Sequence, residues 1–175
     1  GRTVGLYVEL KAPGFHRREG HDLVGPTLAV LTAHGYTSRD SAIWIQSFDP
    51  FCLKSLRRVH KSPLRLLQLV GPNVWRETPG VDHERMLTPA GLAEVARYAD
   101  AIGPSIDQLI ERDGAAPRLR RDIVEKAHSL GLHLHPYTIR TDALPAGLTL
   151  ETLVSLLFDD LKVDGVFTDF PDRVI

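Results

Sequence analysis

The chain has 175 residues, of which 43% are hydrophobic and 25% are charged, and this balance is ordinary for a globular domain with its own core. The formal net charge of −1 argues against a surface for nucleic acid or for anionic membranes. No apolar run approaches the ~20 residues of a transmembrane helix. Cys52 is the only cysteine, which excludes a disulfide framework and a multi-thiolate metal site.

The first predicted strand covers residues 4–11. Aliphatic side chains alternate along it with aromatic and charged ones: Leu6, Val8 and Leu10 against Tyr7, Glu9 and Lys11. Because successive side chains of a strand point to opposite faces, Glu9 and Lys11 share one face near the end of the strand. Strand ends carry the chemistry of α/β enzymes. An edge strand with solvated charges is the alternative.

Helices and strands are expected to alternate from there to residue 70. In chain order, we expect a turn-rich loop at 12–20, a helix at 22–34, a strand at 42–48, a helix at 49–59 and a strand at 64–70. Gly35 is suited to end the first helix. Asp49 followed by Pro50 is an N-cap with proline in the first turn.

The second half of the chain continues the alternation. We expect an excursion at the active-site end over 71–87, a helix at 90–98, a strand at 99–104, a loop or short helix at 107–112, a helix at 118–130, a strand at 132–140, a helix at 150–161 and a strand at 163–168. Such βα units predict a parallel sheet of the α/β class. No Gly-rich nucleotide fingerprint follows the first strand.

Glu9 is the best candidate for a metal ligand, because hard divalent cations prefer carboxylate oxygens. Asp169 is the nearest second carboxylate, although it equally suits a turn. Lys11 could hold a phosphate oxygen. His133 and His135 could ligate zinc or be ordinary, hydrogen-bonded barrel histidines.

Three consecutive side chains, His16, Arg17 and Arg18, could face an anionic ligand or lie in a solvated loop. Cys52 is expected to be packed. Ser47 lies in no nucleophile-elbow context.

Several motifs, in order, resemble the glycerophosphodiester phosphodiesterase family, above all its long, periplasmic or secreted bacterial branch. They are Tyr-Val-Glu-Leu-Lys-Ala-Pro at 7–13, Gln-Ser-Phe-Asp at 46–49, Tyr-Ala-Asp-Ala-Ile-Gly-Pro at 98–104, His-Pro-Tyr-Thr-Ile-Arg at 135–140 and Asp-Gly-Val-Phe-Thr-Asp-Phe-Pro-Asp at 164–172.

The resemblance implies a TIM-type (β/α)₈ barrel that hydrolyses glycerophosphodiesters to an alcohol and glycerol 3-phosphate. It implies a divalent cation, calcium or else magnesium, with Glu9 as a ligand and Lys11 near the phosphate. Gln46, Phe48 and Tyr137 would border the small-molecule substrate. A periplasmic or secreted location and a role in phospholipid and glycerol metabolism follow from the resemblance alone.

The chain departs from this family in one respect. Six strands are predicted where a (β/α)₈ barrel has eight. The family's opening His-Arg-Gly strand and its Glu-x-Asp strand are not found, so no residue is assigned to the two catalytic histidines. We therefore expect residues 1–175 to form a single, N-terminally incomplete barrel domain with low or no activity of its own.

Unpaired sheet edges should make such a domain poorly stable or prone to self-association. Two other functions stay open. One is a catalytically dead barrel remnant that acts as a binding or assembly module. The other is a different barrel enzyme acting on phosphate compounds, with Lys11 as a Schiff base.

Overall fold

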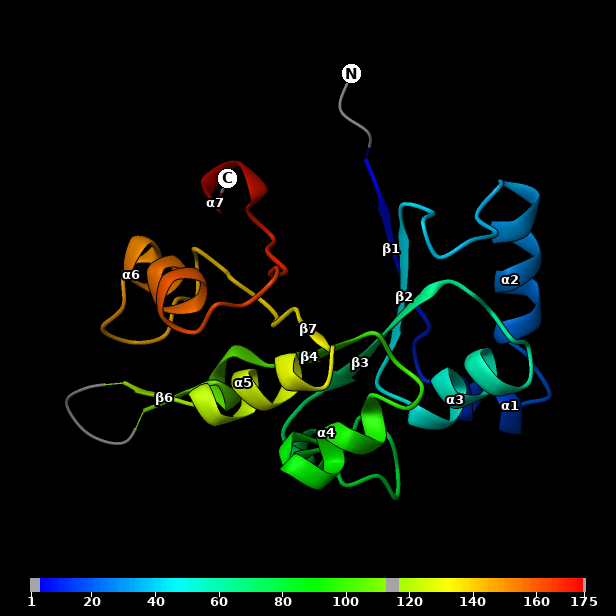
Figure 1. Ribbon diagram of the computed structural model, residues 1–175, viewed down its shortest axis with the longest axis horizontal. Coiled ribbons are helices and arrows are strands. Elements are labelled where there is room, and N and C mark those ends of the chain that lie inside the picture. Colours follow the sequence, from blue (N-terminus) through cyan, green and yellow to red (C-terminus); the bar gives the residue numbers. More distant parts are fainter. Residues whose placement is uncertain (1–3, 113–116, 175) are drawn as a thin grey trace.

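The computed structural model describes residues 4–112 and 117–174, and a five-stranded parallel sheet forms their centre (Figure 1). The strands neighbour one another in the order β1-β2-β3-β4-β7. Their bounds are Leu6–Glu9 for β1, Ile43–Ser47 for β2, Arg65–Val70 for β3, Ala101–Pro104 for β4 and His133–Leu134 for β7. Strand order thus follows chain order, as in a succession of right-handed βα units.

The register of the sheet is staggered. One row of paired residues runs through Glu9, Gln46, Leu67, Ala101 and His133. Glu9 is the last residue of β1, whereas His133 is the first residue of β7. Such a steady shift along the strands is the stagger that tilts the strands of a barrel.

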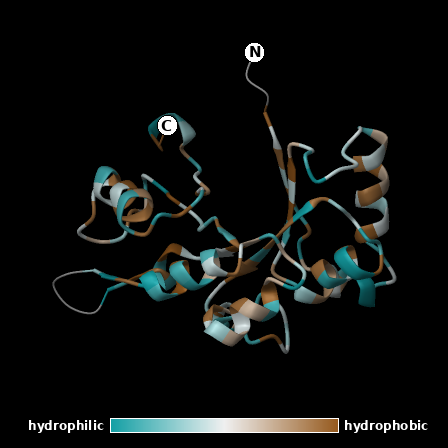
Figure 2. Cartoon of the chain, in the orientation of Figure 1, coloured by the Kyte–Doolittle hydropathy of each residue, from teal (hydrophilic) through white to brown (hydrophobic). Residues whose placement is uncertain are grey.

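Seven α-helices are found in the described part of the chain. They are α1 (Pro13–Arg18), α2 (Val24–Ala33), α3 (Pro50–Arg58), α4 (Pro89–Val95), α5 (Arg121–Ser129), α6 (Leu150–Ser155) and α7 (Pro171–Val174). Hydrophobic and hydrophilic residues alternate along α3 and α5 (Figure 2), which bury Leu53, Leu56, Ile123 and Val124 in the main core. None of the described helices is long and apolar enough to cross a bilayer.

Short elements fill the connections. They are the 3₁₀ turns η1 (Asn73–Trp75), η2 (Glu84–Leu87) and η3 (Ile106–Gln108), the hairpin strands β5 (Ile110–Glu111) and β6 (Arg118–Leu119), and the π-helical turn η4 (Leu156–Asp160) after α6. The loop segment 71–87 thus contains η1 and η2.

Most predicted elements are confirmed, with ends that differ by a few residues. The Asp49 carboxylate caps α3 as expected, since it accepts hydrogen bonds from the amides of Phe51 and Cys52 at 2.8 and 3.2 Å. Gly35, with φ of 84°, adopts the left-handed conformation just after α2.

Two predictions about loops and helix starts were wrong. Residues 12–20 contain helix α1, because Pro13 presets the first turn and the Phe15 amide bonds to the Ala12 carbonyl at 2.9 Å. Residues 118–119 pair with β5, so the predicted helix at 118–130 begins only at Arg121. Pairing of this kind is non-local and has no signal in local periodicity.

Of the last two predicted strands, the first is shorter than expected and the second does not form a regular strand. Regular pairing in 132–140 ends at Leu134, because the following Pro136 has no amide hydrogen to donate. Residues 163–168 are not a strand. The segment nevertheless lies beside β7, since the Asp164 amide bonds to the Leu134 carbonyl at 3.0 Å and Thr168 bridges Ile139.

The sheet is not closed into a barrel within the described residues. β1 pairs only with β2 and is one edge of the sheet, and β7 is the other. Val4 and Leu6 are 82% and 43% exposed. Of the two unpaired edges predicted from the sequence, that of β1 is therefore present, whereas the edge at β7 is covered by hydrogen bonds to the segment 163–168.

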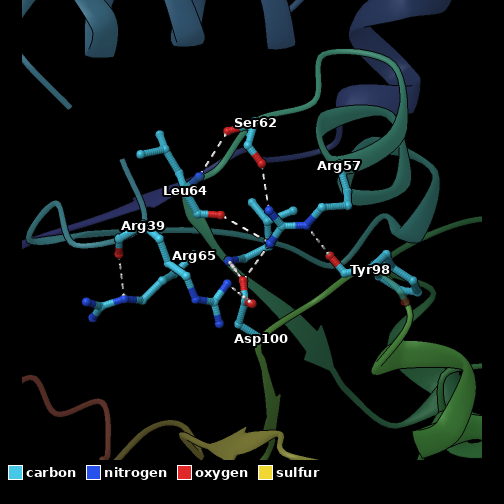
Figure 3. A network of polar contacts seen from close by, with 8 residues as sticks. Arg39, Arg57, Ser62, Leu64, Arg65, Tyr98 and Asp100 are labelled. Carbon is cyan, nitrogen blue, oxygen red and sulfur yellow. Dashed lines mark hydrogen bonds and ion pairs between the residues drawn. The ribbon is translucent and has the colours of Figure 1, made fainter. Parts of the chain in front are cut away.

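A polar cluster ties α3 to the beginnings of β3 and β4 (Figure 3). The Asp100 carboxylate accepts hydrogen bonds from Arg39 and Arg57, both at 2.6 Å, and from the Leu66 amide at 2.8 Å. Arg57 also donates to the carbonyls of Ser62, Leu64 and Tyr98. One carboxylate and one guanidinium thus satisfy the backbone groups where these elements meet.

Candidate functional site

The end of β1 brings a carboxylate and an ammonium together. The Lys11 Nζ donates to Glu9 Oε1 at 2.8 Å, with the Lys11 side chain 78% exposed and that of Glu9 only 21%. The Leu10 amide bonds to the Gln46 carbonyl, and the Ser47 hydroxyl donates to the Leu10 carbonyl at 2.8 Å. These bonds to β2 hold the chain straight between the two charged residues.

All five side chains that the sequence assigned to metal or substrate line one cavity of about 370 Å³. They are Glu9, Lys11, Gln46, Phe48 and Tyr137. Further lining residues are Leu69, Trp75, Glu77, Thr138, Phe167, Thr168 and Asp169. We call this space the Glu9 cavity. It lies at the carboxyl ends of β1, β2 and β3, where a parallel sheet places ligands.

Gln46 lies next to Glu9 in the sheet and is only 8% exposed. Its Oε1 has no hydrogen-bond partner among the described residues. A buried acceptor without a partner costs free energy, so a side chain of this kind is typical of a site that binds a ligand hydroxyl or amine.

Tyr137 forms part of the wall beside Phe48, whose ring meets it edge-on with centroids 5.9 Å apart. The Tyr137 hydroxyl donates to the Val70 carbonyl at 2.9 Å. Gly71 permits this approach, because a Cβ there would lie 2.7 Å from Trp75 and 3.2 Å from the hydroxyl. Burial, and then the carboxylates of Glu77 and Glu9, raise the pKa of Tyr137, so the hydroxyl keeps its proton.

His133 and His135 do not line the Glu9 cavity. His135 Nδ1 lies 2.8 Å from the Tyr7 hydroxyl, and His133 Nδ1 lies 3.4 Å from the Asp164 carboxylate. Burial, and then the neighbouring His133, lower the pKa of His135 to about 4. The structure favours hydrogen-bonded barrel histidines over a zinc pair.

The residues present do not fit a complete metal centre. Within residues 4–112 and 117–174, no group of three or more His, Cys, Asp or Glu side chains is arranged to hold an ion. Asp169 lines the Glu9 cavity but lies 3.6 Å from the Arg140 guanidinium. Glu9 can therefore offer one carboxylate to a cation, and the described residues do not supply the rest.

Cys52 takes no part in this chemistry. It is buried against the main core, as the sequence predicted. Burial and then the Asp49 carboxylate raise the pKa of its thiol to about 12, which keeps it protonated and unreactive.

Trp75 and Glu77 are cavity residues that sequence reasoning missed. Both come from the predicted excursion at 71–87, which has no periodicity that would single them out. Asn73 organises this segment, because its Oδ1 accepts from the His83 amide at 2.8 Å and its Nδ2 donates to Asp82 at the same distance. The buried ring of His83 then packs 6.0 Å from Phe48.

Relatives of known sequence match almost the whole chain. A glycerophosphodiester phosphodiesterase of Haemophilus influenzae is 33% identical over 191 residues, which cover 98% of this chain and 52% of the relative. One of Treponema pallidum is 33% identical over 189 residues, covering 98% and 53%. The chain therefore spans about half the length of the curated relatives it matches.

Solved structures show the same fold. A putative glycerophosphoryl diester phosphodiesterase from Silicibacter pomeroyi matches 97% of this chain and 48% of its own, with a TM-score of 0.68 and 22% identity. A phosphodiesterase from Oleispira antarctica, solved in complex with the product sn-glycerol-3-phosphate, matches 97% and 53%, with a TM-score of 0.64 and 18% identity. The likeness confirms the predicted α/β barrel class, of which this chain forms the open part described above.

The family model for the glycerophosphoryl diester phosphodiesterase family matches residues 2–173. That match covers nearly the whole chain, and it agrees with the motifs at 7–13, 46–49, 135–140 and 164–172. This chain belongs to the glycerophosphoryl diester phosphodiesterase family.

Proposed function

We propose that this chain forms part of the active site of an enzyme that hydrolyses glycerophosphodiesters to an alcohol and glycerol 3-phosphate. Family membership and the names of the relatives support the activity. The observation that carries the proposal is that Glu9, Lys11, Gln46, Phe48 and Tyr137 line one cavity at the carboxyl ends of the strands.

Each side chain has a role that follows from its place. The Lys11 ammonium neutralises a phosphate oxygen, and the unpartnered Gln46 Oε1 accepts a hydrogen bond from a glycerol hydroxyl. Phe48 and Tyr137 cover the carbon skeleton and exclude water. Glu9 contributes one carboxylate to a divalent cation, calcium or magnesium, which lowers the charge of the diester when bound.

The remaining parts of the site come from outside the described residues. Glu9 is a single carboxylate, and the sequence offers no assignable histidine pair for acid and base. We therefore propose that this chain is the larger part of a divided or longer barrel. The open edge at β1 supports this proposal.

Release of glycerol 3-phosphate from glycerophosphocholine tests the proposal. We expect little or no release by the chain alone, and calcium-dependent release once the first two βα units of a family member are added as a separate piece. In that mixture Glu9→Gln should lower the rate by at least about 100-fold. This exceeds the effect of replacing a residue that only hydrogen-bonds to a metal ligand. Glu125→Gln, an exposed change on α5, is the matched control.

Two results would contradict this proposal. One is release that persists in chelator and in Glu9→Gln. The other is no release from any mixture although the two pieces associate. The second result favours the alternative of a catalytically inactive module, for which the lack of a metal-binding group in the described segments is the supporting observation.

A Schiff-base enzyme finds no support. A Schiff-base lysine is activated by desolvation or by a neighbouring cation. The Lys11 side chain is instead 78% exposed and ion-paired with Glu9.

We also propose a periplasmic or secreted location and a role in phospholipid and glycerol metabolism, which the resemblance to that bacterial branch supports. Fractionation of cells that produce the tagged protein tests the location. Recovery of the tag only with cytoplasmic markers would contradict it.

A further inference from the structure

A second cleft, of about 400 Å³, adjoins the Glu9 cavity. The two spaces share Glu9, Lys11, Phe48 and Glu77. From these residues the second cleft extends over α1 and the beginning of α3. A ligand held at Lys11 can therefore extend one end into the Glu9 cavity and the other end into the second cleft.

The last turn of α1 contributes Arg17 and Arg18 to this second cleft. Both side chains are exposed, and neither forms an ion pair within the part of the chain that the structure describes. Other acids of the cleft are already engaged, since Glu9 pairs with Lys11 and Asp49 caps α3. Two guanidinium groups thus face a cleft in which Glu77 is the remaining acid.

Local packing fixes α1 in this place. Pro13 is buried, and Ala12 before it has a φ of 45°, which turns the chain sharply after β1. A Cβ at Gly14 would lie 3.4 Å from Asp49 Oδ2 and 3.8 Å from Arg18 Nη1. Both distances are ordinary van der Waals contacts, so α1 packs against the capped end of α3 and the Arg18 guanidinium lies close to Gly14.

We propose that the second cleft holds the alcohol half of the diester, and that Arg17 and Arg18 select alcohols that carry a further anionic group. This inference rests on the proposed function. Lys11, shared by both spaces, would face the phosphate, the glycerol half would lie toward Gln46, and the alcohol half would lie along α1. Guanidinium groups bind phosphate and carboxylate in a bidentate manner, which gives them both affinity and geometric selectivity.

Two diesters that differ by a single phosphate group test the inference: glycerophosphoinositol 4-phosphate and glycerophosphoinositol. Binding of each to the full 175-residue chain is measured by calorimetry at low salt, with phosphorus NMR to verify that the ligand stays intact. We expect the phosphorylated ligand to bind about tenfold tighter, as hydrogen bonds to charged groups allow. Rising salt should reduce the difference, because both arginines are exposed.

Substitutions then assign the preference to the two arginines. Arg17→Gln combined with Arg18→Gln should abolish the preference and leave binding of glycerophosphoinositol within about twofold, since the neutral inositol group offers the two guanidinium groups no charged partner. Replacing both by Lys should restore part of the preference. Arg58→Gln combined with Arg97→Gln makes the same charge change at exposed positions away from the cleft and should leave the preference intact.

The outcomes separate this inference from the proposed function. If both ligands bind equally well, or if the Gln variant keeps the preference, the role of Arg17 and Arg18 is wrong and the proposed function stands. If neither ligand binds while the chain is folded, as judged by its circular dichroism, both proposals fall.

Discussion

His135 is a titratable side chain whose protonation the fold opposes. Its ring is largely buried between Tyr7, Trp44 and His133, and its pKa is lowered from the usual 6.5 to about 4. In the unfolded chain the ring binds a proton below pH 6.5, whereas in the folded chain it does so only below about 4. The unfolded state therefore gains protons first as the pH falls, and stability is lost across this interval.

The expected loss of unfolding free energy between pH 7 and pH 4 is up to about 3 kcal/mol from this residue. Denaturant titrations at the two pH values measure it. His135→Gln should show a smaller decrease than the wild type, and His34→Gln, which changes an exposed ring after α2, should show the same decrease as the wild type. An unchanged pH dependence in His135→Gln would contradict this assignment.

Gln46 and Gln68 are buried side-chain amides on neighbouring strands that differ in their hydrogen-bond partners. Gln46 Oε1 lacks a partner, whereas Gln68 donates to the carbonyls of Ser47, Phe48 and Leu69 and accepts from the Tyr98 hydroxyl at 2.8 Å. The first amide is thus free to bind a ligand, and the second holds the structure together.

Substituting leucine at each position should separate binding from stability. Gln46→Leu should raise the unfolding free energy by about 1 kcal/mol, because an orphaned acceptor is removed, and should weaken binding of glycerol 3-phosphate about tenfold. Gln68→Leu should lower the unfolding free energy by about 2–4 kcal/mol, because several buried groups lose partners. Denaturation and calorimetry measure both effects, and a destabilised Gln46→Leu variant would show that its oxygen has a structural role instead.

At the scale of the elements, the Asp100 cluster ties the end of α3 to the beginnings of β3 and β4. The Asp100 side chain is 11% exposed and that of Arg57 is 24% exposed, whereas Arg39 is 61% exposed. The contact with Arg57 is therefore shielded from water, and the contact with Arg39 is open to it. The extent of shielding from water decides how much each ion pair contributes to the free energy of unfolding.

Asp100→Asn should lower the unfolding free energy by about 2–4 kcal/mol, because it leaves the partly buried Arg57 without its counter-charge. Arg39→Gln, which breaks the exposed contact of the same carboxylate, should cost less than about 1 kcal/mol. Urea denaturation of the two variants provides the comparison. Equal losses of unfolding free energy in the two variants would mean that burial does not determine how much each contact of Asp100 stabilises the fold.

At the scale of the whole molecule, the open sheet is the dominant feature. β1 has a free edge, and Val4 and Leu6 are exposed beside it. A free edge exposes unpaired backbone groups that can pair with another chain. We propose that the isolated chain self-associates through this edge.

Sedimentation velocity over a range of concentrations should show reversible association. Leu6→Lys should weaken the association at least about fivefold, because a lysine on an edge strand opposes pairing. Val59→Lys, which changes an exposed aliphatic residue at the end of α3, should leave it unchanged. A sharp two-state melt of a monomer at all concentrations would argue against self-association.

The sequence by itself determined the α/β class, the alternation of most helices and strands, and the placement of Glu9 and Lys11 on one face at the end of β1. These features depend on local periodicity, on caps such as Asp49 and on a two-residue spacing. All of them act over a few residues, so they can be read without knowledge of the fold.

Only the tertiary structure decided which distant residues share a space. Trp75 and Glu77 enter the Glu9 cavity through the contacts of Asn73. Arg17 and Arg18 reach the adjoining cleft on a helix that was predicted as a loop. Residues 163–168 hydrogen-bond to the segment after β7 without forming a regular strand. Each outcome depends on contacts between residues far apart in the chain. Local pattern carries no information about such contacts, because their free energy arises only when the sheet brings the partners together.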